Sequence, residues 1–141
     1  GMYVAADNDA MITGFKMNLQ QPDGETGVNI PFVIYEGNAE SGPYTRIHRT
    51  THLVGTNGYY GPTGINVQIL AGKYYLFAAY MPLGTGYYYV NGTSSALTYD
   101  LKFGTSIGNE SFTTSTEPVA SYTFDGTYLS SYRMWIESYL N

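Results

Sequence analysis

The sequence contains no cysteine, which excludes disulfide bonds, thiol catalysis and metal sites with cysteine ligands. Charged residues are scarce, at 12% of 141, and the net charge is −5 at pH 7. A negative chain of this kind is not expected to present a general nucleic-acid-binding surface. No apolar run is long enough for a transmembrane helix. The length fits a single domain with a sizeable core.

Tyrosine and glycine are abundant, with 16 and 17 residues respectively. Aromatic side chains favour strands, and glycine favours turns. This much aromatic content also argues against a disordered chain. The composition therefore indicates a β-rich, turn-rich fold.

The clearest strand signal lies between Ile65 and Ile69. Ile65, Val67 and Ile69 alternate with Asn66 and Gln68, as expected for a strand with one buried and one exposed face. We therefore expect the two amide side chains on the exposed face.

A turn centred on Gly72 should follow, because glycine tolerates a positive φ. The segment from Tyr74 to Tyr80 is apolar or aromatic at every position. This pattern predicts a strand that is covered on both faces.

Similar patterns predict further strands, separated by polar loops at 20–27, 55–64 and 104–118. The remaining expected strands span residues 11–19, 29–35, 44–54, 86–90, 96–103, 119–124 and 128–140. In the first, Phe15, Met17 and Leu19 should point inward. Pro31 should place the second at a sheet edge or a strand start. The segment 128–140 also fits an amphipathic helix, and we favour the strand.

We expect residues 1–10 to form a loose lead-in, in which Gly1 is typical of the remnant of a removed tag. Residues 11–141 should then form a single domain. Eight or nine strands at this spacing are typical of an all-β sandwich. The predicted fold is a two-sheet antiparallel jelly roll.

Three segments resemble the accessory jelly-roll modules, of carbohydrate-binding type, found in secreted bacterial surface proteins. They read IPFVIYEG at 30–37, SGPYTRI at 41–47 and GINVQILAGKYYLFAAY at 64–80. The resemblance covers residues 30–80 and its motifs are structural. It implies an extracellular or cell-surface module that binds or displays, and it brings no catalytic residue.

Two tyrosine clusters carry the best functional signal. Tyr59 and Tyr60 lie in the predicted loop 55–64, and Tyr87, Tyr88 and Tyr89 lie in a short predicted strand. Since neighbouring strand residues face opposite ways, at least one ring of each cluster should be partly exposed. Tyrosine suits stacking on sugars or packing against a protein partner. The alternative is that these rings cover the ends of the sandwich.

Arg46, His48, Arg49 and His52 form a basic cluster in an acidic chain. Arg46, His48 and His52 would share a face of a regular strand. They suit an anionic or hydroxylated ligand, whereas the simpler interpretation is a solvated edge strand. The two histidines are separated by roughly 13 Å, too far apart to bind one metal ion.

Asp7 and Asp9 offer oxygen ligands at short spacing, so they are candidates for a structural calcium ion. A loose chain end is the alternative explanation. No other cofactor is expected.

No catalytic motif is present: there is no G-x-S-x-G elbow, no phosphate-binding loop and no placed pair of carboxylates. We therefore expect a noncatalytic module that binds carbohydrate through exposed tyrosines, assisted by Arg49, Asn66 and Gln68. The alternative is a structural or adhesive protein–protein interaction domain of a surface or phage-like assembly. Such a domain would use the tyrosines as an oligomer interface.

Overall fold

The computed structural model describes residues 1–20, 27–80, 88–89, 100–109, 121–122 and 135–140. In these residues the chain forms twelve β-strands and no helix. None of the described segments is a helix that could cross a membrane. The strands are β1 (Met2–Ala6), β2 (Ala10–Gln20), β3 (Val28–Gly37), β4 (Tyr44–Val54), β5 (Gly58–Tyr60), β6 (Thr63–Ile69), β7 (Tyr74–Ala79), β8 (Tyr88–Tyr89), β9 (Asp100–Leu101), β10 (Gly104–Asn109), β11 (Ser121–Tyr122) and β12 (Trp135–Leu140).

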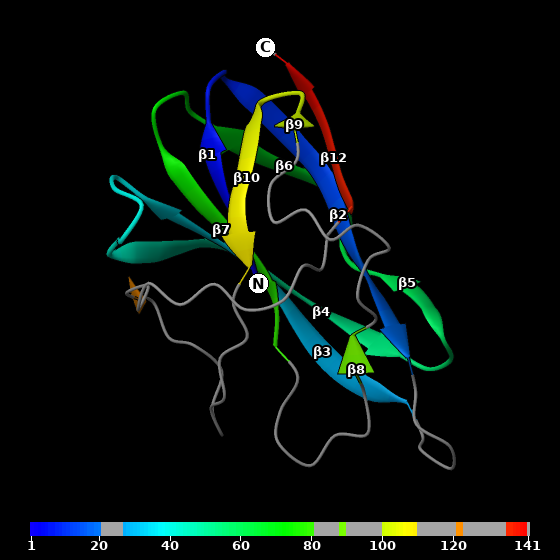
Figure 1. Ribbon diagram of the computed structural model, residues 1–141. Helices are drawn as coiled ribbons and strands as arrows, with labels where there is room; N and C mark the ends of the chain where they lie inside the picture. The colour runs from blue at the N-terminus through cyan, green and yellow to red at the C-terminus, as the bar shows by residue number, and fades with distance from the viewer. Residues whose placement is uncertain (21–26, 81–87, 90–99, 110–120, 123–134, 141) are drawn as a thin grey trace.

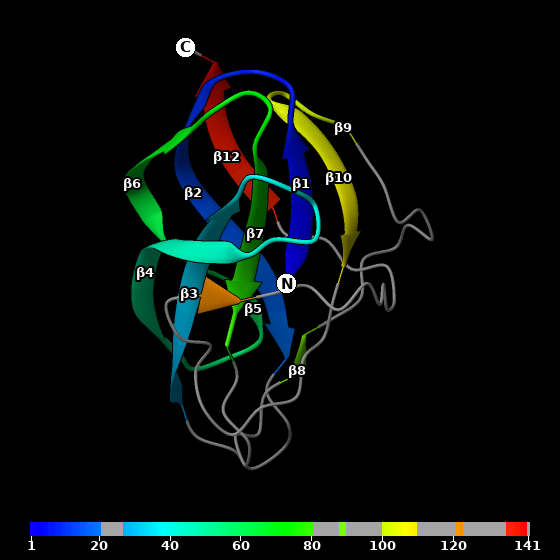
Figure 2. The same cartoon turned by 90° about the vertical axis from the view of Figure 1, so that its left-hand side faces the viewer.

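The strands form two antiparallel sheets that pack as a sandwich (Figure 1). The first sheet has the order β11-β4-β3-β7-β1-β10-β9, and Figure 2 shows it from β4 on the left to β10 on the right. The all-β sandwich is confirmed. The strand number exceeds the eight or nine expected because four strands, β5, β8, β9 and β11, span three residues or fewer.

The second sheet is built around β2. Strands β12 and β6 pair with the first half of β2, and β5 and β8 pair with its end. Residue Leu19 pairs with both Gly58 and Tyr89, so β5 and β8 flank β2 on opposite sides. The long central strand therefore sets the position of every other strand in its sheet.

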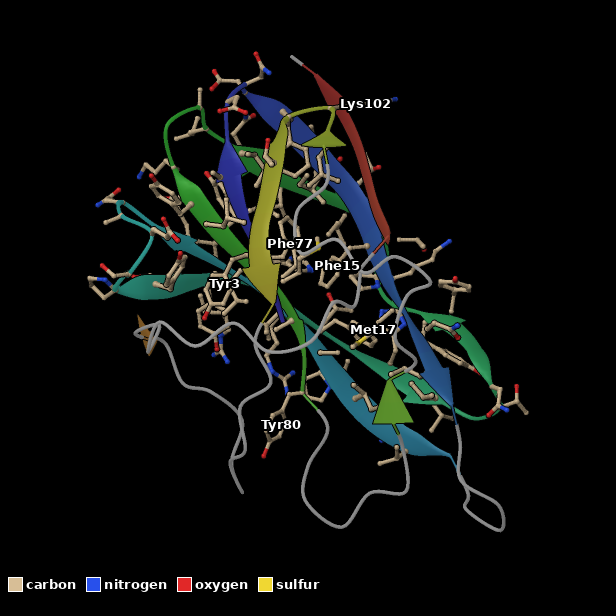
Figure 3. The ribbon with its side chains drawn as sticks, in the orientation of Figure 1. Tyr3, Phe15, Met17, Phe77, Tyr80 and Lys102 are labelled. Carbon is tan, nitrogen blue, oxygen red and sulfur yellow. The ribbon has the colours of Figure 1, made fainter. Side chains whose placement is uncertain are left out.

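The core fills the space between the sheets. Phe15 of β2 meets Phe77 of β7 edge-on, with ring centroids 5.4 Å apart, and Figure 3 shows the two rings between the sheets. The inward positions of Phe15, Met17 and Leu19 are confirmed, since each is at most 3% exposed. The register shifts between Ile12 and Gly14, so the alternation on β2 changes phase at this bulge.

A second apolar cluster lies on the outer face of the first sheet. It contains Tyr3, Val33, Tyr35, Tyr44, Leu76 and Ala78, all at most 1% exposed. In β7, Tyr75 and Phe77 join the core between the sheets, whereas Leu76 and Ala78 join this outer cluster. The prediction that Tyr74 to Tyr80 is covered on both faces is confirmed.

The expected loose lead-in at residues 1–10 is wrong. Met2 to Ala6 form β1, which lies between β7 and β10 in the first sheet. Met2, Tyr3 and Val4 are fully buried. A five-residue strand that is covered on both faces shows no alternation, which explains why the pattern missed it.

Two predicted loops also contain strands. Residues 104–109 form β10, which pairs with β1, and residues 58–60 form β5, which pairs with β2. Gly61, after β5, has its backbone against β2, where a Cβ would collide with the carbonyl oxygen of Phe15. Glycine is therefore required by close approach at this point.

Other predictions hold in part. Residues 135–140 form β12, as the strand interpretation of 128–140 required, and residues 128–134 lie outside the described part. Gly72 has a φ of 81° in the turn before β7, as expected. Pro31 is not at a sheet edge: it pairs with Thr51 near the start of β3, just before the pairing with β7 begins at Phe32.

Candidate functional site

The outer face of the second sheet carries polar side chains along β2, β5 and β6. We call it the polar face and define it by Lys16, Asn18, Tyr59, Asn66 and Gln68. On β2, two of these side chains alternate with the buried Phe15, Met17 and Leu19. On β6, the exposed Asn66 and Gln68 alternate with Val67 and Ile69, which lie in the core. The exposed position predicted for these two amides is confirmed.

Tyr59 provides the aromatic side chain of this face. It pairs with Asn18 and is 65% exposed. Gln68 pairs with Met11, seven residues before Asn18 on β2. At the rise of a strand, the Tyr59 ring and the Gln68 amide are therefore roughly 20 Å apart. The face is long enough for an extended ligand, with Lys16 between its two ends.

Tyr60 lies on the opposite side of β5 from Tyr59. It pairs with the buried Met17 and packs against the core. Its hydroxyl accepts a hydrogen bond from the Thr56 N–H at 3.1 Å and lies 3.3 Å from the Thr56 hydroxyl. These hydrogen bonds lower the pKa of the Tyr60 phenol. Tyr60 therefore fixes the loop before β5, and Tyr59 is the exposed tyrosine of the pair.

The second tyrosine cluster lies near the first along the backbone. In β8, Tyr89 pairs with Leu19, whose other partner is Gly58, and Tyr88 pairs with Gln20. Tyr87 lies outside the described residues. On β12, Trp135 pairs with Lys16. The register thus places β8 and β12 beside the strand that carries the polar face.

Arg49 is not brought together with Asn66 and Gln68. It pairs with Val33, which belongs to the outer cluster of the first sheet. It therefore lies on the opposite outer face of the sandwich, where its Nη1 donates a hydrogen bond to Thr51 Oγ1 at 3.0 Å. A ligand on the polar face cannot contact it.

The expected common face of Arg46, His48 and His52 is interrupted by a bulge. Tyr35 pairs with Arg46 and Ile34 pairs with His48, so one residue of β4 is inserted between them. His48 and His52 stay on the inner face with Thr50, half-buried. Thr50 Oγ1 lies 2.8 Å from His48 Nε2, and burial lowers the pKa of His48. His52 Nε2 is buried and has no hydrogen-bond partner among the residues that the structure describes, and its ring meets Phe32 edge-on at 5.6 Å.

Asp7 and Asp9 are exposed in the turn between β1 and β2. Asp9 Oδ1 accepts a hydrogen bond from the Ala71 N–H at 2.8 Å, and the Asp7 N–H donates to the Phe103 carbonyl at 2.8 Å. In the part of the chain that the structure describes, no three acidic, histidine or cysteine side chains form a metal-binding group. The structure thus assigns Asp9 to turn capping, and calcium binding stays a prediction.

The sequence interpretation missed a polar network at the end of the sandwich where the chain turns from β6 into β7. Glu36 accepts hydrogen bonds from Lys73 Nζ and the Tyr75 hydroxyl, both at 2.9 Å, and the same hydroxyl accepts one from the Leu70 N–H at 2.9 Å. Burial raises the pKa of Tyr75 well above its ordinary value. Because Glu36 and Tyr75 are cross-strand partners far apart in sequence, only the register reveals them. The network fixes the turn between β6 and β7.

The sequence interpretation also missed Lys16 and Asn18 as candidate binding residues. Their alternation with Phe15, Met17 and Leu19 was a usable signal for their exposure. Comparisons of the chain with protein-family models, with curated proteins and with solved structures found no match. The geometry of the polar face is therefore the feature from which a function can be inferred.

Proposed function

We propose that the chain is a noncatalytic carbohydrate-binding module that holds its ligand on the polar face. The exposed ring of Tyr59, 65% accessible and paired with Asn18 on the polar face, is the observation that supports this most. A tyrosine ring stacks on the apolar face of a sugar, and asparagine amides such as Asn18 and Asn66 can both donate to and accept from hydroxyl groups. Gln68 would act as an acceptor through its Oε1, because its Nε2 donates to the Ala10 and Ile69 carbonyls at 3.1 and 2.9 Å. This combination fits a neutral, hydroxyl-rich ligand.

The mechanism is binding without covalent chemistry. One sugar ring stacks on Tyr59, and further units extend along β2 toward Asn66 and Gln68. Tyr88 and Tyr89 belong to this proposal because β8 pairs beside the Tyr59 end of β2. Tyr87, which lies outside the described residues, is included on the sequence pattern alone. A single shallow face of this kind binds weakly, so attachment would depend on several sites acting together.

We also propose that the sandwich is a jelly roll and that the chain acts outside the cell or on its surface. The chain passes between the two sheets from β1 to β2, β2 to β3, β4 to β5 and β6 to β7, and this supports a jelly-roll connection. A jelly-roll binding module of this resemblance would act outside the cell or on its surface.

Glycan-array binding followed by calorimetry tests the function. We expect the native chain to bind one class of glycan and Tyr59→Ala to lose at least tenfold in affinity. Tyr59→Trp, which keeps a flat ring, is the matched control and should retain binding. A native chain that binds no glycan, or Tyr59→Ala with native affinity, would contradict the proposal.

A second function, protein–protein interaction in a surface or phage-like assembly, is favoured by one observation on the opposite sheet. Leu53 and Ile47 of β4 are 67% and 41% exposed on a strand that lies next to the short β11. Large exposed apolar side chains on a sheet edge are typical of interaction surfaces.

A further inference from the structure

Gln68 is held by the backbone of the two strands that it lies on. Its Nε2 donates one hydrogen bond to the Ala10 carbonyl at 3.1 Å and another to the Ile69 carbonyl at 2.9 Å. Ala10 and Ile69 are cross-strand partners at the point where β6 ends. The amide of Gln68 therefore closes over the last pair of this ladder, while the residue remains exposed on the polar face.

These two hydrogen bonds fix the polarity of the Gln68 side chain. A primary amide has two N–H donors, and here both are used by backbone carbonyls. Turning the amide over would place Oε1 against two carbonyl oxygens and leave them without their donors, which is unfavourable. The atom that Gln68 offers to a ligand is therefore Oε1, which only accepts hydrogen bonds.

Asn66 provides a contrast two positions earlier on the same strand. It is exposed on the polar face, as Gln68 is. Among the residues that the structure describes, no hydrogen bond holds its amide. The amide of Asn66 can therefore turn to present either its donor or its acceptor. Polarity is fixed at residue 68 and adjustable at residue 66.

We propose that Gln68 determines which class of glycan the polar face accepts: it selects chains with unmodified hydroxyl groups and excludes acidic glycans. This selection rests on the proposed function. A hydroxyl group donates to Oε1, whereas a carboxylate or a sulfate has only acceptors and is repelled by Oε1. The net charge of −5 opposes an acidic ligand as well.

Lys16 alone would predict the opposite preference, because an ammonium group attracts acidic sugars. It lies on β2 five residues from Met11, the cross-strand partner of Gln68, so the two polar groups are roughly 15 Å apart. A repeating chain on this face therefore meets both with different units. An ammonium only donates and Oε1 only accepts, and a hydroxyl group suits both. An acidic chain suits Lys16 alone.

Calorimetry with a matched pair of ligands tests the selection. The pair is the uncharged oligosaccharide that binds best on the glycan array and the same oligosaccharide after oxidation of its primary hydroxyl groups to carboxylates. The native chain should prefer the unoxidised form. Gln68→Met keeps the length of the side chain and removes Oε1. Its affinity for the unoxidised form should fall about two- to tenfold, as for the loss of one hydrogen bond. Its affinity for the oxidised form should not fall, so the ratio of the two affinities should decrease.

Asn66→Leu is the matched control on the same strand. It should weaken both forms by the same factor and leave the ratio unchanged, because an amide that can turn contributes to both. Since the readout is a ratio, a partly unfolded variant does not alter it. A ratio that changes as much at residue 66 as at residue 68 would overturn the selection. Preferential binding of acidic glycans on the array, or of the oxidised form, would do the same and leave glycan binding intact. A chain that binds no glycan at all would refute the proposed function itself, and the selection with it.

Hydrogen exchange of the side-chain amides tests the fixed orientation without any glycan. Exchange requires that a hydrogen bond opens, so the Nε2 protons of Gln68 should exchange with solvent more slowly than the Nδ2 protons of Asn66. NMR of the native chain measures both rates. Equal rates would show that the Gln68 amide turns as the Asn66 amide does, and the selection would then fail even in a chain that binds a glycan.

Discussion

The two outer faces of the sandwich use tyrosine in opposite ways. On the first sheet, Tyr3, Tyr35 and Tyr44 are fully buried, and Tyr3 meets Tyr44 edge-on at 5.4 Å. On the second sheet, Tyr59 is 65% exposed among polar side chains. Tyrosine abundance alone is therefore no sign of function in this chain. The distinguishing feature is what surrounds the ring: an apolar cluster on the first sheet, and the polar partner Asn18 for Tyr59 on the second.

The largest effect is expected from the outer cluster of the first sheet. Leu76→Ala should lower the free energy of unfolding by about 2–5 kcal/mol, because it removes a fully buried side chain and leaves a cavity. Urea denaturation measures this change. A cost below about 1 kcal/mol would show that this face is not a second core, and the contrast between the two faces would then disappear.

Gly61→Ala should have the next largest effect. The new Cβ would collide with the Phe15 carbonyl oxygen, and relief of the clash by a backbone shift should cost about 1–3 kcal/mol. Gly55→Ala is the control, because nothing lies within 4 Å of its Cβ position. Equal unfolding midpoints for the two variants would disprove the close approach of β5 to β2, on which the position of Tyr59 depends.

The polar face was only partly predictable from sequence. Alternation gave the inward residues of β2 and the exposed amides of β6, because one face of each strand is buried. It could not show the bulges near Thr13 and Ile47, since one inserted residue reverses which side chains share a face. The separation of Arg46 from His48, and the opposite placement of Arg49 and Asn66, follow from pairing between distant segments.

Strands that are buried on both faces were the other part of the fold that the sequence predicted incompletely. In β7 every residue is apolar or aromatic, so burial on both faces was evident. In β1 and β10 the segments are short and contain small or polar residues. They become strands because they pair with each other and because β1 also pairs with β7. Such tertiary pairing overrides local preference.

A smaller effect concerns the pH dependence of stability. Burial lowers the pKa of His48 in the folded chain, so the unfolded chain binds a proton more readily. Its contribution to stability is present above the unfolded pKa of about 6.5 and is lost as the pH falls from there toward the folded value. Denaturation between pH 7.5 and 5 should show a shallower acid loss in His48→Gln than in the native chain. Identical pH profiles would show that the inner face of β4 is fully solvated.

The smallest effect on stability is expected at Tyr59. Because its ring is largely exposed, Tyr59→Ala should change the free energy of unfolding by no more than about 0.5 kcal/mol. The same variant is expected to lose glycan binding. A large loss of stability would assign this ring to the fold, as for the tyrosines of the first sheet.

Nitration of the native chain with tetranitromethane, followed by peptide mass spectrometry, tests the contrast between the two faces most directly. The reagent modifies tyrosine rings that solvent reaches, and the folded chain needs no substitution. Tyr59 should be modified faster than Tyr3, Tyr35 and Tyr44, which should remain protected until the chain unfolds. Modification of Tyr35 or Tyr44 at the rate of Tyr59 would contradict the assignment of one face to the core and the other to binding.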